Sequence, residues 1–294
     1  MSSILTNASA LSALQSLTQT QAALKTTENQ VSTGLAVSSA ADNASYWSIA
    51  TQLGASSGVV TSANSALSQS QAVLSTASSA INSVITTIKA IESALTQAAT
   101  PGASITDIDK TLTQLGKQLT DAVSGASFNG LNVLDGSTSS LDFVAGFNAS
   151  SSGGKLNTIT FTSNALIDGT TAGQGILEGG TGTASGSGQD LLTLGTTVSD
   201  ATTASSALQG VATVLSAVTN YAATIGATQD RMTAASTFNS ALTTNYSTGV
   251  SALVDADMNT ASTRLQALQT QEQLGIQSLS IANQNAQLIL KLFP

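Results

Sequence analysis

Apolar residues recur every seven positions through the segment 56–99, and a second apolar row follows the first at a distance of three residues. This spacing places both rows on one face of an α-helix, in the a/d pattern of a coiled coil. No proline or glycine interrupts the segment from position 59 to 100, so the pattern predicts one helix roughly 50–60 Å long. The first row consists of Val60, Leu67, Leu74, Ile81, Ile88 and Leu95. The second consists of Ala63, Ser70, Ala77, Val84 and Ile91, in which Ser70 is the one polar position.

The segment after this helix carries a stop signal and a new start signal. Pro101-Gly102 ends the first helix, and Ser104 with Asp107 is predicted to cap a second helix over Ile105–Val123.

Both ends of the chain show similar amphipathic patterns with few charges. An isolated helix of this kind is marginal in water, so each end is predicted to need a partner, either the other end of the chain or a neighbouring subunit. The residues that we expect in these packing rows are Leu11, Leu17, Leu24 and Val31 near the N-terminus, Val218 and Ile225 in the last third, and Leu265, Leu268, Leu279 and Leu288 near the C-terminus.

The middle of the chain, from Ser127 to about Ser206, is rich in Gly, Ser, Thr and Asn. Leu141–Phe147 and Lys155–Ile167 are predicted strands, and Gly179–Gly188 is predicted to be a flexible loop. The fold class is therefore mainly α: long antiparallel helical rods of coiled-coil type formed by the N- and C-terminal segments, with a small β-rich central insert. We expect three parts, namely a terminal helical domain (1–40 with 254–294), a rod domain (41–135 with 195–253) and an outer tip (136–194).

Composition indicates a protein that associates with copies of itself. Charged residues make up 8% of the chain and aromatic residues 3%, while 41% of residues are hydrophobic. A surface with so few charges resists association poorly. The net charge of −8 offers no basic footprint, so neither nucleic acid nor an anionic membrane is an expected partner.

The inventory of reactive side chains argues against an enzyme. The chain has no histidine and no cysteine, which removes catalytic triads, thiol nucleophiles and most zinc sites; no cofactor and no metal are expected. Asp255 and Asp257 permit two readings, an acid pair or a negatively charged helix start, and the macrodipole favours the second. Tyr46-Trp47, the one aromatic pair, permits two readings, a ligand platform or packing in the interior at a bend between helices, and the second is expected.

The sequence predicts neither a cleaved secretory signal nor a membrane-spanning segment. The first positive charge is Lys25 and no compact apolar region follows the start, so no cleaved secretory signal is expected. No run of about eighteen apolar residues predicts a membrane span.

Five segments, in order and at both ends of the chain, resemble those of bacterial flagellins. The resemblance covers roughly residues 1–135 and 205–294, and it adds Arg231, Asp255 and Asp257 to the candidate packing and polymer-contact residues. The segments are Val31-Ser-Thr-Gly-Leu35 with Ser39-Ala-Ala-Asp-Asn-Ala44, Ser127-Phe-Asn-Gly-Leu131 with Val133-Leu-Asp-Gly136, Ile225-Gly-Ala-Thr-Gln-Asp-Arg231, Val254-Asp-Ala-Asp257, and Ala282-Asn-Gln-Asn285 with Leu288–Phe293.

The resemblance implies a small flagellin of the α-proteobacterial type, a subunit that polymerises into the flagellar filament for swimming motility. It implies export without a cleaved signal through the flagellar type III channel, an extracellular location, and terminal helices that line the inner tube. The implied partners are copies of the chain, alone or with other flagellins, together with an export chaperone and the hook-junction and filament-cap proteins. Thr87 and Lys89 stand where many flagellins carry arginines, so recognition by innate immune receptors is not expected.

Two other functions share parts of this pattern. A hook–filament junction protein has the same helical ends, and a flagellin-like surface protein could bind a polysaccharide at its tip. The tip offers Phe143, Phe147 and Phe161, whose spacing is typical of strand core rather than of an exposed sugar platform. We also expect residues 137–194 to face solvent and to accept an insertion near Gly182.

Overall fold

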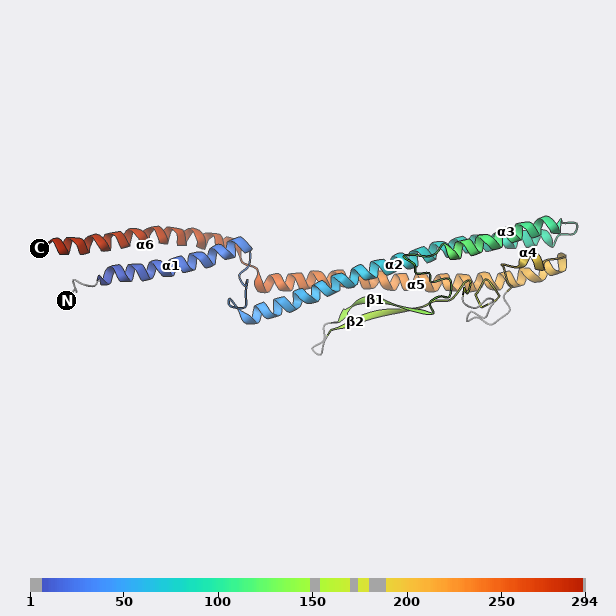
Figure 1. The fold of residues 1–294 in the computed structure, drawn as a ribbon, viewed down its shortest axis with the longest axis horizontal. Coiled ribbons are helices and arrows are strands. Elements are labelled where there is room, and N and C mark those ends of the chain that lie inside the picture. The colour runs from blue at the N-terminus through green and yellow to red at the C-terminus, as the bar shows by residue number, and fades with distance from the viewer. Residues whose placement is uncertain (1–6, 149–153, 170–173, 180–188, 293–294) are drawn as a thin grey trace. The chain divides into compact units, whose positions relative to one another are not determined.

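The computed structural model describes residues 7–148, 154–169, 174–179 and 189–292, with side chains as far as residue 284 (Figure 1). The chain forms two compact units, and each contains segments from both halves of the sequence. Unit 1 comprises Met1–Ser57 with Thr244–Pro294, and unit 2 comprises Gly58–Thr243. Gly182, the predicted insertion point, and most of the predicted loop Gly179–Gly188 lie outside the described residues.

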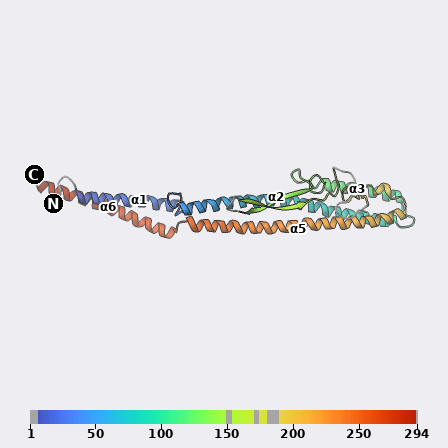
Figure 2. The ribbon, with the colours of Figure 1, turned by 90° about the horizontal axis from the view of Figure 1, so that it is seen from below.

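Two long helices, α2 (Ala44–Ala98) and α5 (Ala201–Val254), run antiparallel through unit 2 (Figures 1 and 2). The amide of Gln71 donates to the hydroxyl of Thr233 at 3.3 Å, and the amide of Gln229 donates to the hydroxyl of Ser75 at 3.4 Å. These bonds fix the register of the two helices. The predicted a row of α2, from Val60 to Leu95, is fully buried at 0% exposure, and this confirms the predicted helical fold.

Serine and threonine hydroxyls on the helices bond to the backbone of their own helix. Thr86 Oγ1 donates to the carbonyl of Asn82 at 2.9 Å, and Thr224 Oγ1 donates to that of Asn220 at 3.1 Å. The same bond to the carbonyl four residues earlier occurs in all three helices longer than 30 residues. The polar faces of these helices thus carry many hydroxyls, and many of the hydroxyl protons are already bonded within the helix.

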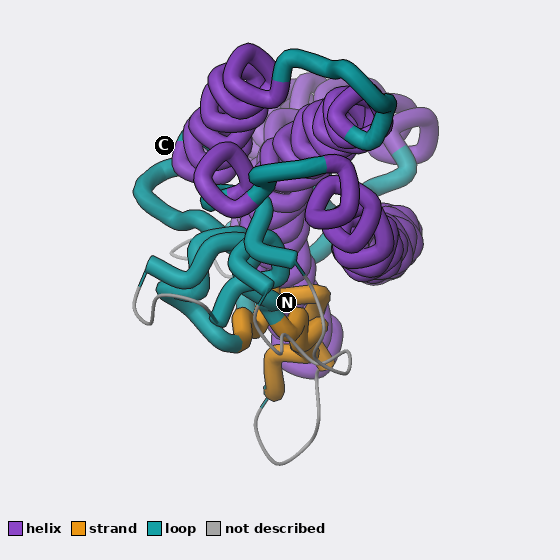
Figure 3. The backbone as a smooth tube through the Cα atoms, turned by 90° about the vertical axis from the view of Figure 1, so that its right-hand side faces the viewer, coloured by secondary structure: helices purple, strands orange, loops and turns teal. Residues whose placement is uncertain are grey.

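The β-rich insert is one antiparallel hairpin, β1 (Ser140–Asn148) and β2 (Lys155–Thr162), that lies on one side of the helices of unit 2 (Figure 3). Phe143 and Ile159 face each other across the ladder and are buried. A bulge interrupts β1 between Val144 and Gly146. There the amide of Asn239 donates to the carbonyl of Ala145 at 2.8 Å, which joins the hairpin to α5.

The second strand is shorter than predicted, because the chain leaves the ladder after Thr162. The hydroxyl of Ser163 donates to the carbonyl of Val133 at 2.6 Å, and the backbone N–H of Leu166 donates to that of Leu134 at 2.8 Å. The phenol of Tyr221 on α5 donates to the same Val133 carbonyl at 2.9 Å. The insert therefore shares one core with the helices of unit 2, and the three-part division of the chain stays a prediction.

Two further helices complete unit 2: α3 (Ile105–Ser124) and the single turn α4 (Leu194–Thr197). α3 begins where the sequence predicts, and Ser104 lies at the N-cap position, but its side chain does not form the expected capping hydrogen bond. The hydroxyl of Ser104 donates to the carboxylate of Asp107 at 2.9 Å and makes no bond to the helix backbone. Lys110 pairs with the same carboxylate at 3.1 Å, and this bond is the main reason that the pKa of Asp107 is lowered.

Unit 1 is built on α1 (Ala8–Thr33) and α6 (Met258–Leu292), which pack against each other. Asn7 caps α1 by accepting from the N–H of Ala10 at 3.1 Å, and its amide donates to the carbonyl of Ala282 at 3.0 Å. At the other end of α1, Gly34 adopts φ 73° and its carbonyl accepts from the N–H of Ala256 at 2.8 Å. Hydrogen bonds thus join the N-terminal and C-terminal segments of the chain at the start and at the end of α1.

Candidate assembly surfaces

The predicted row on α1 faces α6 only in part. Leu17, Leu24 and Val31 are half-buried, whereas Leu11 is 69% exposed and the neighbouring Leu14 is 48% exposed. Thr27, which the sequence did not single out, is buried and bonds the carbonyl of Ala23. A pair of helices buries one stripe of each partner, so the apolar residues at the start of α1 remain without cover from the described part of unit 1.

The predicted residues on α6 lie toward α1, but other apolar residues of α6 do not. Leu268 is buried and Leu265 and Leu279 are half-buried. The side chain of Leu288 lies outside the described residues. A second set of apolar residues on this helix is exposed. The heptad rows predicted from the sequence did not include these residues, because they do not lie on the predicted apolar stripe. Its members are Leu274, Ile276 and Ile281, which are 59%, 54% and 59% exposed.

The turn before α6 shows why the aspartates lie there. Asp257 accepts from the N–H of Asn259 at 3.0 Å and from the hydroxyl of Thr260 at 2.7 Å. These bonds, with the Thr260 hydroxyl first, lower the pKa of Asp257. Asp255 has an exposed side chain, and its backbone pairs with Leu35. The arrangement is that of a helix cap, as the macrodipole argument favoured.

The expected interior position of the aromatic pair is wrong. Tyr46 and Trp47 lie in the first turns of α2 and are 48% and 40% exposed, and Ile49 beside them is 48% exposed. Within unit 1, the described residues leave this face of α2 uncovered. The loop before it is well ordered by hydrogen bonds, since the carboxylate of Asp42 accepts from the hydroxyl and the N–H of both Ser38 and Ser39. The same bonds lower the pKa of Asp42.

The predicted residues of unit 2 divide between core and surface. Val218 and Ile225 on α5 are fully buried at 0% exposure, while Arg231 is exposed. Both Thr86 and Thr87 lie outside the a row of α2, which predicts a position off the core for each. Thr86 is exposed, but Thr87 is buried, so this prediction is wrong for Thr87. α2 buries a wider stripe than a two-helix seam requires, because segments other than α5 also cover it.

In the part of the chain that the structure describes, no group of three or more carboxylates, histidines or cysteines is placed to hold a metal ion. No described helix combines the length and the hydropathy that a membrane crossing requires. What the molecule presents instead is a set of exposed apolar residues on helices of low charge.

Comparison with protein families decides what these helices belong to. The family model of the bacterial flagellin N-terminal helical region matches residues 4–139, and that of the C-terminal helical region matches residues 208–293. This chain belongs to the bacterial flagellin family. The resemblance seen in the sequence is thereby confirmed.

Curated flagellins match this flagellin along its whole length. A flagellin of Brucella melitensis is 39% identical, with 100% of this chain and 99% of the relative covered. Flagellin C of Rhizobium meliloti is 37% identical and flagellin FljM of Caulobacter vibrioides is 33% identical, each with 100% of this chain and 99% of the relative covered. Among solved structures, that of Bacillus cereus flagellin is 22% identical and superposes with a TM-score of 0.42, covering 58% of this chain and 86% of that one.

This flagellin is a structural subunit of the bacterial flagellar filament. Flagellins are structural proteins rather than enzymes, and they polymerise with copies of themselves into an extracellular filament. The surfaces through which the subunits meet are therefore the functional sites of the molecule.

Proposed function

We propose that this flagellin polymerises through the terminal helices of unit 1. The observation that carries the proposal is the apolar surface that α1 and α6 leave uncovered after they pack together. Leu11 and Leu14 on α1, and Leu274, Ile276 and Ile281 on α6, are all about half exposed or more. Several exposed large apolar residues on a pair of helices with few charges indicate an interaction site, and another copy of the same helices supplies further apolar residues to cover them.

Two further parts of the proposal concern how the subunit reaches the filament. The chain leaves the cell unfolded through the flagellar type III channel and then folds at the growing end. Contacts that are local in sequence form quickly, and the heptad helices supply many of them. An export chaperone, the hook-junction proteins and the filament cap are the partners that we assign to these steps.

The polysaccharide-binding alternative receives no support from the insert. Phe143 and Phe161 are buried in the core of unit 2, and their rings lie 6.2 Å apart. A sugar platform needs exposed aromatic faces, but those of Phe143 and Phe161 are turned into the protein, and Phe147 is half-buried.

Truncation tests the proposal. A chain of residues 44–254 keeps α2, α5 and the whole of unit 2 and lacks both terminal helices. We expect it to remain a helical, soluble monomer by circular dichroism and sedimentation. It should form no filaments in negative-stain micrographs under conditions in which the full chain does.

A point variant makes the same test without removing whole segments. Ile276→Asp places a charge on the exposed face of α6, so the monomer should melt as before while polymerisation is lost. Gln266→Asp, at an exposed polar position of the same helix about two turns or more from Leu274, Ile276 and Ile281, is the matched control. Filament formation by the truncated chain would refute the assignment of these helices.

A further inference from the structure

The turn between Phe128 and Leu131 holds the one Asn-Gly pair of the chain, Asn129-Gly130. Phe128 and Leu131 exchange backbone hydrogen bonds of 2.9 and 3.0 Å across this turn. Both turn residues have positive φ, 51° and 78°, and asparagine followed by glycine is a pair that a two-residue turn of this kind favours. The need for positive φ thus explains why these two residue types stand together here.

The side chain of Asn129 is free at this turn. It is exposed, and neither its amide nor the N–H of Gly130 makes a hydrogen bond with any other described residue. A Cβ added at Gly130 would meet nothing within 4 Å, so the space around this peptide is open. The amide of Asn132, by contrast, is buried and donates to the carbonyl of Val123 at 2.7 Å, while its oxygen accepts from the N–H of Leu134 at 2.9 Å. Only the first of these two amides is therefore free to rotate.

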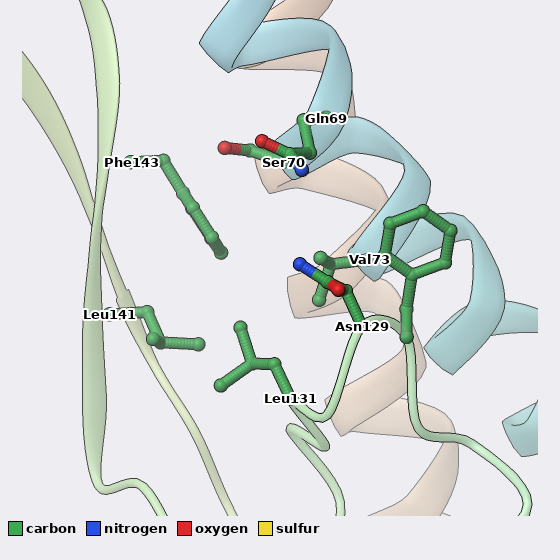
Figure 4. Close-up of a pocket in the computed structure, with 8 residues that line it drawn as sticks. Gln69, Ser70, Val73, Asn129, Leu131, Leu141 and Phe143 are labelled. Atoms are coloured by element: carbon green, nitrogen blue, oxygen red, sulfur yellow. The ribbon is translucent and has the colours of Figure 1, made fainter.

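Asn129 also lies on the wall of a surface cavity, together with Val73 of α2, Leu131 and Phe143 of β1 (Figure 4). The volume of the cavity is ≈ 280 Å³. A water molecule takes about 30 Å³ of the liquid, so several waters fit beside the amide. No residue that lines the cavity is charged, and a carboxylate formed at position 129 would be the first charge on this wall.

An asparagine in this setting can lose its amide to water without an enzyme. The peptide nitrogen of Gly130 gives up its proton to hydroxide and bonds to Cγ of Asn129, and the bond from Cγ to Nδ2 breaks. Nδ2 takes back a proton and leaves as ammonia, and glycine has no side chain to hinder this attack. The cyclic imide that remains takes up one water, which opens the ring at one of its two carbonyl carbons. One opening gives aspartate, and the other gives isoaspartate, whose backbone runs through Cγ.

We propose that Asn129 is a site of spontaneous deamidation in the folded flagellin. Ring closure requires the backbone of Asn129 to rotate out of the turn, and the two bonds between Phe128 and Leu131 oppose this rotation. A loop closed by few hydrogen bonds opens locally while the rest of its unit stays folded. The reaction in the native chain is therefore slower than in the unfolded chain, but it is directed to Asn129. The inference goes beyond the filament function and does not depend on how the subunits meet.

Isoaspartate at position 129 changes the turn itself. It adds one carbon atom to the backbone between Phe128 and Leu131, so the two hydrogen bonds can no longer form together. Phe128 and Leu131 pack against the core of unit 2, and this product therefore lowers the stability of that unit. Aspartate leaves the backbone path unchanged, and Asp-Gly is also a favoured pair in such a turn, so the second product has little effect.

Peptide mapping of the full chain tests the site. The purified protein is kept below its polymerisation concentration in mildly alkaline buffer, sampled over several weeks and digested with trypsin. The tryptic peptide 118–155 contains Asn129, Asn132 and Asn148, and fragment ions locate the mass increase that replacement of NH₂ by OH produces. We expect the increase at Asn129 and none at Asn132, at a rate that rises in proportion to the hydroxide concentration. A mass increase confined to the urea-unfolded chain, or spread evenly over the three asparagines, overturns the proposal.

Two variants test the consequence for the turn. Asn129→Gly keeps a residue that accepts positive φ and removes the reacting amide. After the same incubation, the unsubstituted protein should contain isoaspartate in peptide 118–155, detected with protein isoaspartate methyltransferase, and should melt at a lower temperature than when fresh. Asn129→Gly should show neither change, and fresh Asn129→Asp should melt close to the fresh unsubstituted protein. An equal loss of melting temperature in Asn129→Gly would place the damage elsewhere and contradict the proposal.

Discussion

The buried row of α2 allows a quantitative test of the helical core. Ile81 is 0% exposed, and Ile81→Ala removes three carbon atoms from its side chain. At about 0.8 kcal/mol for each buried methylene, the transfer contribution is about 2.4 kcal/mol. The space left behind adds to this, because the surrounding helices relax only in part. The free energy of unfolding should therefore fall by about 2–5 kcal/mol.

The assay is urea unfolding of the monomer, followed by helical circular dichroism at a concentration below that of polymerisation. Thr86→Asp is the control on the same helix. Thr86 is exposed and its hydroxyl bonds only to its own helix, so the change should stay within about 0.5 kcal/mol. Thr87 does not serve as this control, since it is buried. Equal losses from Ile81→Ala and Thr86→Asp would show that α2 is covered all round, and the two-faced description would be abandoned.

Three other predictions follow from single positions. Gly226→Ala should raise the free energy of unfolding by about 1 kcal/mol, because a Cβ at this position meets nothing within 4 Å. Gly210→Ala should lower the free energy of unfolding, because its Cβ would lie 2.6 Å from the Cβ of Gln189. Urea unfolding of both variants compares the two changes. Burial raises the pKa of Tyr221, so its contribution to stability is present below pH 10 and is lost as the pH rises through the raised value. Tyr221→Phe should remove that part of the alkaline loss in pH-dependent melting. An epitope inserted near Gly182 should leave polymerisation intact and bind antibody along the filament.

The helices were predictable because their information is local. A seven-residue repeat without proline or glycine specifies both the helix and its buried face, and α2 contains the whole predicted row from Val60 to Leu95. The start of α6 was predictable for the same reason, since Asp257 bonds to residues within three positions of itself.

What the sequence could not give depends on segments that are distant in the chain. Thr87 is buried although its position lies outside the a and d rows. Tyr46 and Trp47 are exposed although aromatic pairs usually pack inside. β2 ends early because Ser163 turns to bond the carbonyl of Val133, thirty residues earlier. No local pattern encodes which distant segment covers a given face.

The candidate assembly residues show the same division. The predicted rows located the stripes by which α1 and α6 meet, with Leu268 buried between them. They did not locate the exposed set that includes Ile276, because an exposed apolar residue becomes informative only once its neighbours are known. A search for apolar residues that fall off each helical stripe would have found this set.

The hydrogen bonds that serine and threonine hydroxyls make within the helices affect the cost of removing water from the helix surfaces during assembly. A serine or threonine that already donates to its own helix leaves no proton without a partner when a neighbour displaces the solvent, and Thr86 and Thr224 are of this kind. When water is removed from such a face, few hydrogen bonds between these hydroxyl protons and water are lost, and the hydroxyls carry no charge that must be desolvated. Contacts made through it should depend little on ionic strength, since salt screens charges and acts weakly on neutral hydroxyls. A flagellin with 8% charged residues can therefore stay hydrated as a single molecule and still pack dry against its neighbours.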